Sequence, residues 1–148
     1  MAKVGYAYVC GDIMHIGHIL HLNNCKALCD VLFVGVLSER AVMEKKAKPL
    51  ISLAERMYAI SNLKAVDCAV CQDEYSPLEN CKAIRPDILF ESSSHSEMPA
   101  NNFIKSIGGR VIAMPYFAEQ SSSNLKKGLK NVKTDTVIGS ISDTAGRS

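Results

Sequence analysis

The sequence contains no tryptophan, few other aromatic residues and almost no excess charge of either sign. Its 17 Lys and Arg residues oppose 15 Asp and Glu residues, which leaves a formal net charge of +2. A balance this close to neutral does not point to a nucleic acid or an anionic membrane surface as the partner. No stretch approaches the roughly 20 apolar residues of a transmembrane helix, so we expect no membrane span.

The N-terminal region lacks the apolar core and the cleavage site of a secretory signal, because it reaches Cys10-Gly11-Asp12 almost at once. We therefore expect a cytoplasmic protein whose six cysteines are reduced. A zinc site would require several of these thiols to converge. Cys68 and Cys71 instead lie in an apolar run that is typical of a strand, and free cysteine is commonly buried.

The length of 148 residues and the hydrophobic share of 47% suit one globular domain. Apolar, β-prone runs alternate with segments of helical pattern. Strands are expected at 4–9, 31–37, 67–71, 87–90 and 110–114, and helices at 18–28, 53–63, 77–84, 101–107 and 121–129. This alternation predicts an α/β fold, a doubly wound (Rossmann-like) three-layer sandwich with a five-stranded parallel sheet. We expect residues 1–133 to form the domain and residues 134–148 to form a flexible tail.

Positive charge gathers in two places despite the neutral total. Lys45, Lys46 and Lys48 form one cluster, and residues 101–148 hold seven Lys and Arg against three Asp and Glu. Two small basic patches suit a compact anion such as a phosphate better than a long polyanion. Taken alone, they are interpreted more simply as solvated surface.

The loop after the first expected strand contains a histidine pair, His15 and His18, separated by Ile16-Gly17. Ligands of doubly wound folds bind beyond the carboxyl ends of the strands, so this loop is the first place to look for a site. Gly17 removes a side chain that would block a phosphate, and the free N–H groups of a helix start attract anions. Backbone N–H groups of Cys10 and Gly11 can add further donors. The pattern indicates stabilisation of charge on a triphosphate.

The stretch His15-Ile16-Gly17-His18 after Gly11-Asp12 resembles the HxGH signature of the nucleotidyltransferase superfamily. Three more segments are similar in the same order. They are the basic loop with its E-R helix at 43–56, the Val-Asp step at 66–67 and the serine-rich stretch at 115–123. Within the superfamily the chain looks most like the cytidylyltransferases that act on glycerol 3-phosphate or on phosphonates.

The resemblance implies an enzyme that transfers CMP from CTP to a small phosphate- or phosphonate-bearing acceptor and releases pyrophosphate. No protein nucleophile is required. The implied catalytic residues are His15, His18, Lys46 and its neighbour Lys45. Mg²⁺ is the implied cofactor, held mainly by the phosphates and not by the protein. The implied nucleotide-binding residues are Cys10, Gly11, Gly17, Tyr116, Ser121 and Ser122, although the two serines can equally be plain helix caps.

The chain departs from the family pattern at the acceptor side. Ser92-Ser93-Ser94-His95 stands where the family often has G-D-D-W, and Tyr116 stands where the glycerol-phosphate enzymes have arginine. Some phosphonate-type members have tyrosine there. We expect the acceptor to meet Glu91, His95 and Asp12. A homodimer is expected because relatives are often dimers. Two alternatives stay open: an adenylyltransferase of the same fold that uses ATP, and a non-catalytic nucleotide-binding domain.

Overall fold

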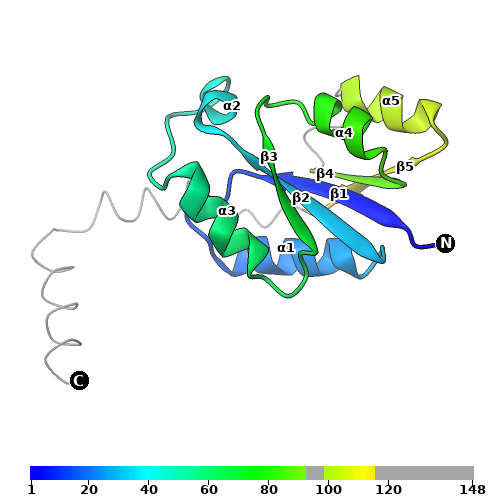
Figure 1. The fold of residues 1–148 in the computed structure, drawn as a ribbon, viewed down its shortest axis with the longest axis horizontal. Helices are drawn as coiled ribbons and strands as arrows, with labels where there is room; N and C mark the ends of the chain where they lie inside the picture. Colours follow the sequence, from blue (N-terminus) through cyan, green and yellow to red (C-terminus); the bar gives the residue numbers. More distant parts are fainter. Residues whose placement is uncertain (93–98, 116–148) are drawn as a thin grey trace, which may run out of the picture.

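A computed structural model describes residues 1–92 and 99–115 of the chain, and strands and helices alternate through both ranges (Figure 1). The strands are β1 (Val4–Val9), β2 (Val31–Leu37), β3 (Cys68–Gln72), β4 (Ile88–Ser92) and β5 (Arg110–Met114). The helices are α1 (Ile16–Lys26), α2 (Glu39–Met43), α3 (Leu53–Ser61), α4 (Leu78–Ile84) and α5 (Pro99–Ser106). The helix expected at 121–129 lies outside the described residues.

The five strands form one parallel sheet in the order β3-β2-β1-β4-β5. Helices α1 and α3 cover one face of the sheet, and α4 and α5 cover the other (Figure 1). The result is the predicted Rossmann-like, doubly wound sandwich of three layers, so the expected fold class is confirmed. No helix among the described residues is long and apolar enough to cross a membrane.

Burial on both faces explains the continuous apolar sequence of β2. Leu22, Val34 and Ile60 belong to the core beneath α1 and α3, and Tyr6 and Leu89 belong to the core beneath α4 and α5. Gly35 of β2 is required by a close approach, because a Cβ atom there would lie 2.0 Å from the Tyr6 hydroxyl oxygen. That hydroxyl group donates a hydrogen bond of 2.5 Å to Oε1 of Gln72 on β3.

Capping residues set the starts of the helices. Ser52 accepts a hydrogen bond from the backbone N–H of Glu55 (3.3 Å) and starts α3 as the sequence predicts. The short helix α2 was not predicted, although Ser38 caps it by accepting from the N–H of Ala41 (3.2 Å). Pro77 is the N-cap residue of α4 and not part of its first turn, where the sequence placed it.

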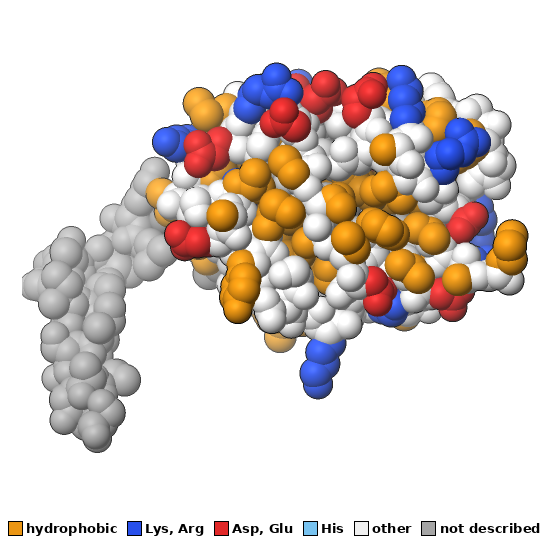
Figure 2. Space-filling model, viewed as in Figure 1, with side chains coloured by type: hydrophobic (Ala, Val, Ile, Leu, Met, Phe, Trp, Pro, Cys, Tyr) orange, Lys and Arg blue, Asp and Glu red, His pale blue; other side chains and the backbone are white. Residues whose placement is uncertain are grey.

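The edge strand β3 is the most apolar part of the surface seen in Figure 2, where hydrophobic side chains gather across the middle of the face. Cys71 is exposed there, and Cys68, Ala69 and Val70 are half-buried. All six cysteines lie in the described residues, and none of them forms a disulfide bond. Cys68 and Cys71 lie on β3, as the sequence predicts.

Candidate active site

The sheet opens at the carboxyl ends of β1 and β4. β1 pairs with β2 over six residues, from Val4 to Val9, but its register with β4 consists of the pairs Gly5–Ile88 and Tyr6–Leu89. The strand order changes direction between β1 and β4, which makes this the topological switch point where such folds bind ligands. The loop that follows β1 carries the histidine pair to this edge of the sheet.

The two histidines close the N-terminus of α1 as a capping box. The Nδ1 atom of His15 accepts a hydrogen bond from the backbone N–H of Gly17 (3.0 Å). The backbone N–H of His15 donates in return to Nδ1 of His18 (3.3 Å). The ring centroids lie 4.0 Å apart, with the ring planes inclined at 45°. The helix starts at Ile16, two residues earlier than predicted, because a histidine side chain caps it.

These contacts assign the tautomer of both rings. A nitrogen that accepts a hydrogen bond carries no proton, so each neutral imidazole holds its proton on Nε2. Both histidines thus present an N–H donor on the side of the ring away from the helix backbone. The Nε2 atom of His15 is buried and has no hydrogen-bond partner within the described residues. A buried donor of this kind is expected where a ligand oxygen binds.

Both rings are neutral at pH 7. Burial, followed by the charges of His15, His21 and Lys46, lowers the pKa of His18 to about 4. Burial also lowers the pKa of His15. A polyphosphate placed against these rings would favour their charged forms and raise both pKa values. The site can therefore take up positive charge in response to a bound anion.

The predicted lysines lie on the turn that follows α2. The backbone N–H groups of Lys45 and Lys46 both donate to the carbonyl oxygen of Val42, at 3.1 and 2.9 Å. Both side chains are exposed. The charge of Lys46 acts on His18, so the structure brings this lysine and the histidine pair into one electrostatic environment. Lys48 forms an ion pair with Glu39 (3.8 Å).

The side chain of Asp12, a predicted acceptor-binding residue, binds backbone N–H groups in this structure. Its side chain is only 1% exposed. Oδ2 accepts from the N–H of Leu50 (3.0 Å), and Oδ1 accepts from the N–H of Ile51 (2.9 Å). Both carboxylate oxygens therefore join the histidine loop to the segment that follows the lysines.

Sequence reasoning missed the part played by Arg56, a buried guanidinium 1% exposed on α3. Its Nε donates to the carbonyl oxygen of Ile51 (2.9 Å). Its Nη1 donates to the carbonyl oxygens of Cys10 (2.8 Å) and Leu37 (2.6 Å). Arg56 thus ties together the carboxyl ends of β1 and β2 and the loop before α3. The sequence signal for this burial was the spacing of Arg56, which stands four residues before Ile60 and so lies on the same face of the helix.

Gly11 and Gly17 differ in backbone conformation and in surroundings. Gly11 has φ of +69°, a left-handed conformation that favours glycine, and a Cβ atom there would lie 2.7 Å from Cδ1 of Ile60. Gly17 is buried at the N-terminus of α1 and donates its N–H to His15. The backbone of Cys10 is held through its carbonyl oxygen by Arg56. Contact of these three residues with a nucleotide stays a prediction.

Glu91 is the residue before the last in β4, at the same edge of the sheet, and is 1% exposed. The hydroxyl group of Tyr8 on β1 donates to its Oε2 (3.1 Å). Burial raises the pKa of Glu91 to about 7, and the hydrogen bond from Tyr8 opposes part of that rise. The structure therefore places a carboxyl group, charged only in part at neutral pH, at the opening between β1 and β4.

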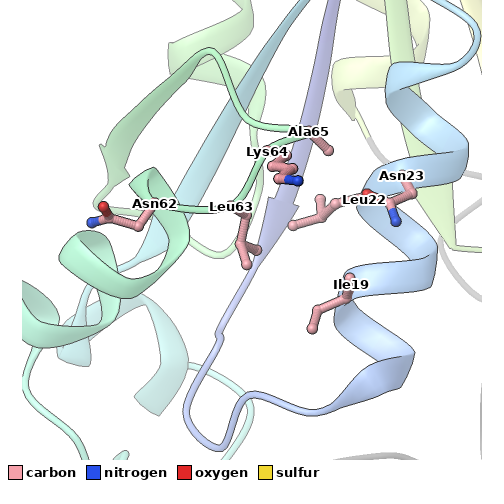
Figure 3. Close-up of a pocket in the computed structure, with 7 residues that line it drawn as sticks. All are labelled: Ile19, Leu22, Asn23, Asn62, Leu63, Lys64 and Ala65. Carbon is pink, nitrogen blue, oxygen red and sulfur yellow. The ribbon is translucent and has the colours of Figure 1, made fainter.

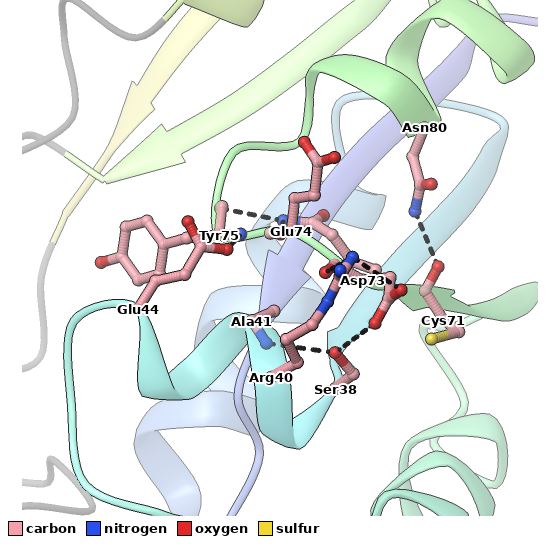
Figure 4. Close-up of polar contacts among 10 residues, drawn as sticks. Ser38, Arg40, Ala41, Glu44, Cys71, Asp73, Glu74, Tyr75 and Asn80 are labelled. Carbon is pink, nitrogen blue, oxygen red and sulfur yellow. Dashed lines mark hydrogen bonds and ion pairs between the residues drawn. The ribbon is translucent and has the colours of Figure 1, made fainter.

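A polar network fixes α2 to the loop after β3 (Figure 4). The hydroxyl group of Ser38 and Nη2 of Arg40 both donate to the carboxylate of Asp73, at 2.7 and 2.9 Å. The Oε2 atom of Glu44 accepts from the backbone N–H of Tyr75 (2.8 Å). The turn that carries the lysines is thus attached to the strand edge on one side and to Asp12 and Arg56 on the other.

A groove of about 290 Å³ separates α1 from the segment after α3 (Figure 3). Ile19 and Leu22 of α1 point toward Leu63 across it. Its lining comprises Ile19, Leu22, Asn23, Asn62, Leu63, Lys64 and Ala65. It therefore contains none of the predicted site residues and is separate from the candidate active site.

The remaining predicted site residues, His95, Tyr116, Ser121 and Ser122, lie outside the described residues. Within residues 1–92 and 99–115, no group of three or more His, Cys, Asp and Glu side chains could hold a metal ion.

The sequence profile described as cytidylyltransferase-like matches residues 9–135. The chain belongs to the cytidylyltransferase-like family. The resemblance seen in the HxGH stretch is thereby confirmed, and the domain is a nucleotidyltransferase of that family.

This cytidylyltransferase-like domain is 33% identical over 127 residues to the bifunctional protein HldE of Caulobacter sp. (strain K31), covering 83% of this chain and 26% of that protein. The chain thus spans about a quarter of the length of this relative. Among solved structures it is similar to the lipopolysaccharide core biosynthesis protein of Thermoplasma volcanium. That match has a TM-score of 0.67 and 26% identity, covering 78% of this chain and 97% of the other. Pantothenate synthetase of Thermus thermophilus shares the fold, with a TM-score of 0.56, 13% identity and coverage of 90% and 63%.

Proposed function

We propose that this domain transfers the AMP group of ATP to a phosphate oxygen of a small, hydroxyl-bearing acceptor and releases pyrophosphate. The observation that carries the proposal is the capping box, which fixes His15 and His18 with their Nε2–H donors away from the helix, within reach of the charge of Lys46. The two Nε2–H groups and the ammonium group of Lys46 are three donors that suit the oxygens of a triphosphate. The nucleotide-binding roles of Cys10, Gly11, Gly17, Tyr116, Ser121 and Ser122 belong to the same proposal.

ATP is proposed ahead of CTP because the similarity to HldE proteins favours adenylyl transfer. CTP was the first expectation from the sequence and remains the second candidate, since the family as a whole is cytidylyltransferase-like. A phosphorylated sugar or polyol is proposed as acceptor. The similarity to a lipopolysaccharide core biosynthesis protein supports that class over a phosphonate.

In the proposed reaction an oxygen of the acceptor phosphate attacks the α-phosphorus of ATP. A new P–O bond forms, the bond between the α-phosphorus and the α,β-bridging oxygen breaks, and pyrophosphate leaves with that electron pair. The acceptor is already an anion, so no protein base is needed. The residues of the chain contribute orientation and charge stabilisation, which can supply most of the rate enhancement of such a transfer.

The histidines are suited to a charge that grows during the reaction. Each Nε2–H donates to a phosphate oxygen, and each ring is kept in place through Nδ1. As negative charge builds on the departing pyrophosphate, the depressed pKa of His18 is expected to rise, and the neutral ring then takes up a proton more readily. Lys46 adds a permanent positive charge, and Lys45 stands beside it.

Mg²⁺ is proposed to enter as part of the substrate, on the phosphate oxygens, where it neutralises charge. The described residues offer no cluster of three metal ligands, and both oxygens of Asp12 accept backbone N–H groups.

The test is pyrophosphate release with ATP and with CTP at matched concentrations, against a panel of acceptors. The panel contains sugar phosphates, glycerol 3-phosphate and 2-aminoethylphosphonate, and His18→Ala serves as the inactive control. We expect the highest kcat/KM with ATP and a sugar phosphate. Faster turnover with CTP than with ATP would show that CTP is the nucleotide substrate. Nucleotide binding without turnover of any acceptor would support the non-catalytic alternative.

A further inference from the structure

Two side chains, one from β1 and one from β4, meet just beyond the point where the pairing of these strands ends. Their backbones are in register at Tyr6 and Leu89. Two residues further along each strand stand Tyr8 and Glu91, joined by the hydrogen bond of 3.1 Å from the phenol to Oε2. A side-chain contact thus spans the switch point at the place where an acceptor would enter, while the histidine pair lies at the start of α1.

Two further side chains, from the segment after β3 and from α4, lie near this pair. Tyr8 and Tyr75 both pack against the cluster formed by Leu37 and the helix α2, which precedes the turn that carries the lysines. Burial, followed by the charge of Glu91, raises the pKa of Tyr75 and the pKa of Cys81 on α4. The hydroxyl group of Tyr8 thus contacts the carboxyl group directly, and Tyr75 and Cys81 lie within reach of its charge.

We propose that the carboxyl group of Glu91, held by the hydroxyl group of Tyr8, forms the floor of the acceptor subsite and selects acceptors that carry a hydroxyl group beyond the phosphate. The proposal rests on the nucleotidyl transfer proposed above and adds a specificity-determining residue to it. A carboxyl group repels a phosphate, so Glu91 meets the end of the acceptor that is remote from the reacting oxygen.

A hydroxyl group is the partner that suits this carboxyl group. Desolvation is the largest cause of its raised pKa, so a full negative charge on Glu91 is costly in this setting. A neutral hydroxyl group can both donate to and accept from a carboxyl group that is partly protonated. An ammonium-bearing acceptor would require the fully ionised carboxylate. The setting therefore favours a polyol or sugar phosphate over an aminoalkyl phosphonate.

The experiment compares Glu91→Leu, Glu91→Gln and Tyr8→Phe with the wild-type chain, on the best sugar phosphate and on its deoxy analogues. Glu91→Leu is expected to raise the acceptor KM about 10- to 100-fold while the dissociation constant of ATP stays unchanged. Glu91→Gln keeps the shape and the hydrogen-bonding capacity, and is expected to stay within about 5-fold of wild type. Tyr8→Phe is expected to raise the acceptor KM by a smaller factor than Glu91→Leu.

The deoxy analogues make the test specific. One analogue, which lacks the hydroxyl group that Glu91 binds, should bind wild type about as weakly as the parent acceptor binds Glu91→Leu. That variant should then show no further loss on the same analogue. ATP binding and thermal unfolding show whether each variant is folded. If Glu91→Leu is unstable, the raised acceptor KM of Tyr8→Phe and the loss of binding of the deoxy analogue by wild type carry the test.

Two kinds of failure are distinguishable. If wild type turns over a sugar phosphate but Glu91→Leu leaves the acceptor KM unchanged, the subsite assignment is wrong and the proposed function stands. A preference for aminoalkyl phosphonates that Glu91→Gln abolishes would also overturn the hydroxyl assignment. If wild type turns over no acceptor at all, the proposed function itself fails.

Discussion

Asp12 and Arg56 bind the same short backbone segment from two sides. The carboxylate of Asp12 accepts the N–H groups of Leu50 and Ile51, and the guanidinium of Arg56 donates to the carbonyl oxygen of Ile51. Arg56 also binds the carbonyl oxygen of Cys10, two residues before Asp12. These charge-assisted hydrogen bonds set the distance between the histidine loop and the lysine turn.

Asp12→Asn tests whether Asp12 positions the loop or binds the acceptor. An amide group presents only one acceptor oxygen, so one of the two backbone N–H groups would lose its partner at a cost of about 1–3 kcal/mol in unfolding free energy. We expect that loss in urea unfolding, together with a lower kcat and a nearly unchanged acceptor KM. A raised acceptor KM with unchanged stability would instead assign Asp12 to the acceptor.

Arg56→Lys keeps the charge of the buried side chain but removes the fork that reaches three carbonyl oxygens. Each buried carbonyl left without this donor costs about 1–3 kcal/mol, so we expect clear destabilisation in chemical unfolding. Arg40→Lys is the matched control. Arg40 binds the exposed Asp73 on the surface, and such a pair contributes about 0–1 kcal/mol. Equal effects of the two substitutions would show that the buried fork contributes little.

The tautomers of His15 and His18 are open to nitrogen NMR of the free protein. Both rings should carry the proton on Nε2, and His18 should titrate near pH 4. The unfolded chain binds that proton at a pKa near 6.5, so stability should fall as pH drops from about 6.5 toward 4. Added ATP should raise the pKa of His18. A proton on Nδ1 of either ring would contradict the capping box.

Lys46→Ala and Lys45→Ala form a matched pair on one turn. Removing Lys46 deletes a charge that lowers the pKa of His18, so that pKa should rise in the free protein. The same substitution should lower kcat by about 10²–10³, the usual effect of losing a donor to developing charge. Lys45→Ala should leave the pKa of His18 unchanged and lower kcat less. The reverse ranking would assign the catalytic role to Lys45.

Much of the fold follows from local pattern. The run Val31–Leu37 is apolar throughout because helices cover both faces of β2, and the capping serine at position 52 marks the start of α3. The helix α2 escaped prediction because five residues are too few to show a helical period. The early start of α1 escaped it because histidine is an uncommon capping residue.

The candidate site was predictable in its position but not in all of its roles. The loop after β1 and the HxGH spacing pointed to the histidines, and the resemblance of the basic loop pointed to Lys46, whose charge reaches His18 in the structure. The sequence could not show that Asp12 turns inward to the backbone of residues 50 and 51, because that contact spans 38 residues or more. The same holds for Arg56, whose partners Cys10 and Leu37 lie at the carboxyl ends of two different strands.

The most direct test of nucleotidyl transfer follows the phosphorus atom. ATP labelled at the α-phosphate is incubated with the chain and a sugar phosphate, and ATP labelled at the γ-phosphate is run in parallel. The account predicts that the α label moves to the acceptor and the γ label appears in pyrophosphate, with both transfers lost in His18→Ala. Transfer of the γ label to the acceptor, or equal activity of His18→Ala, would contradict it.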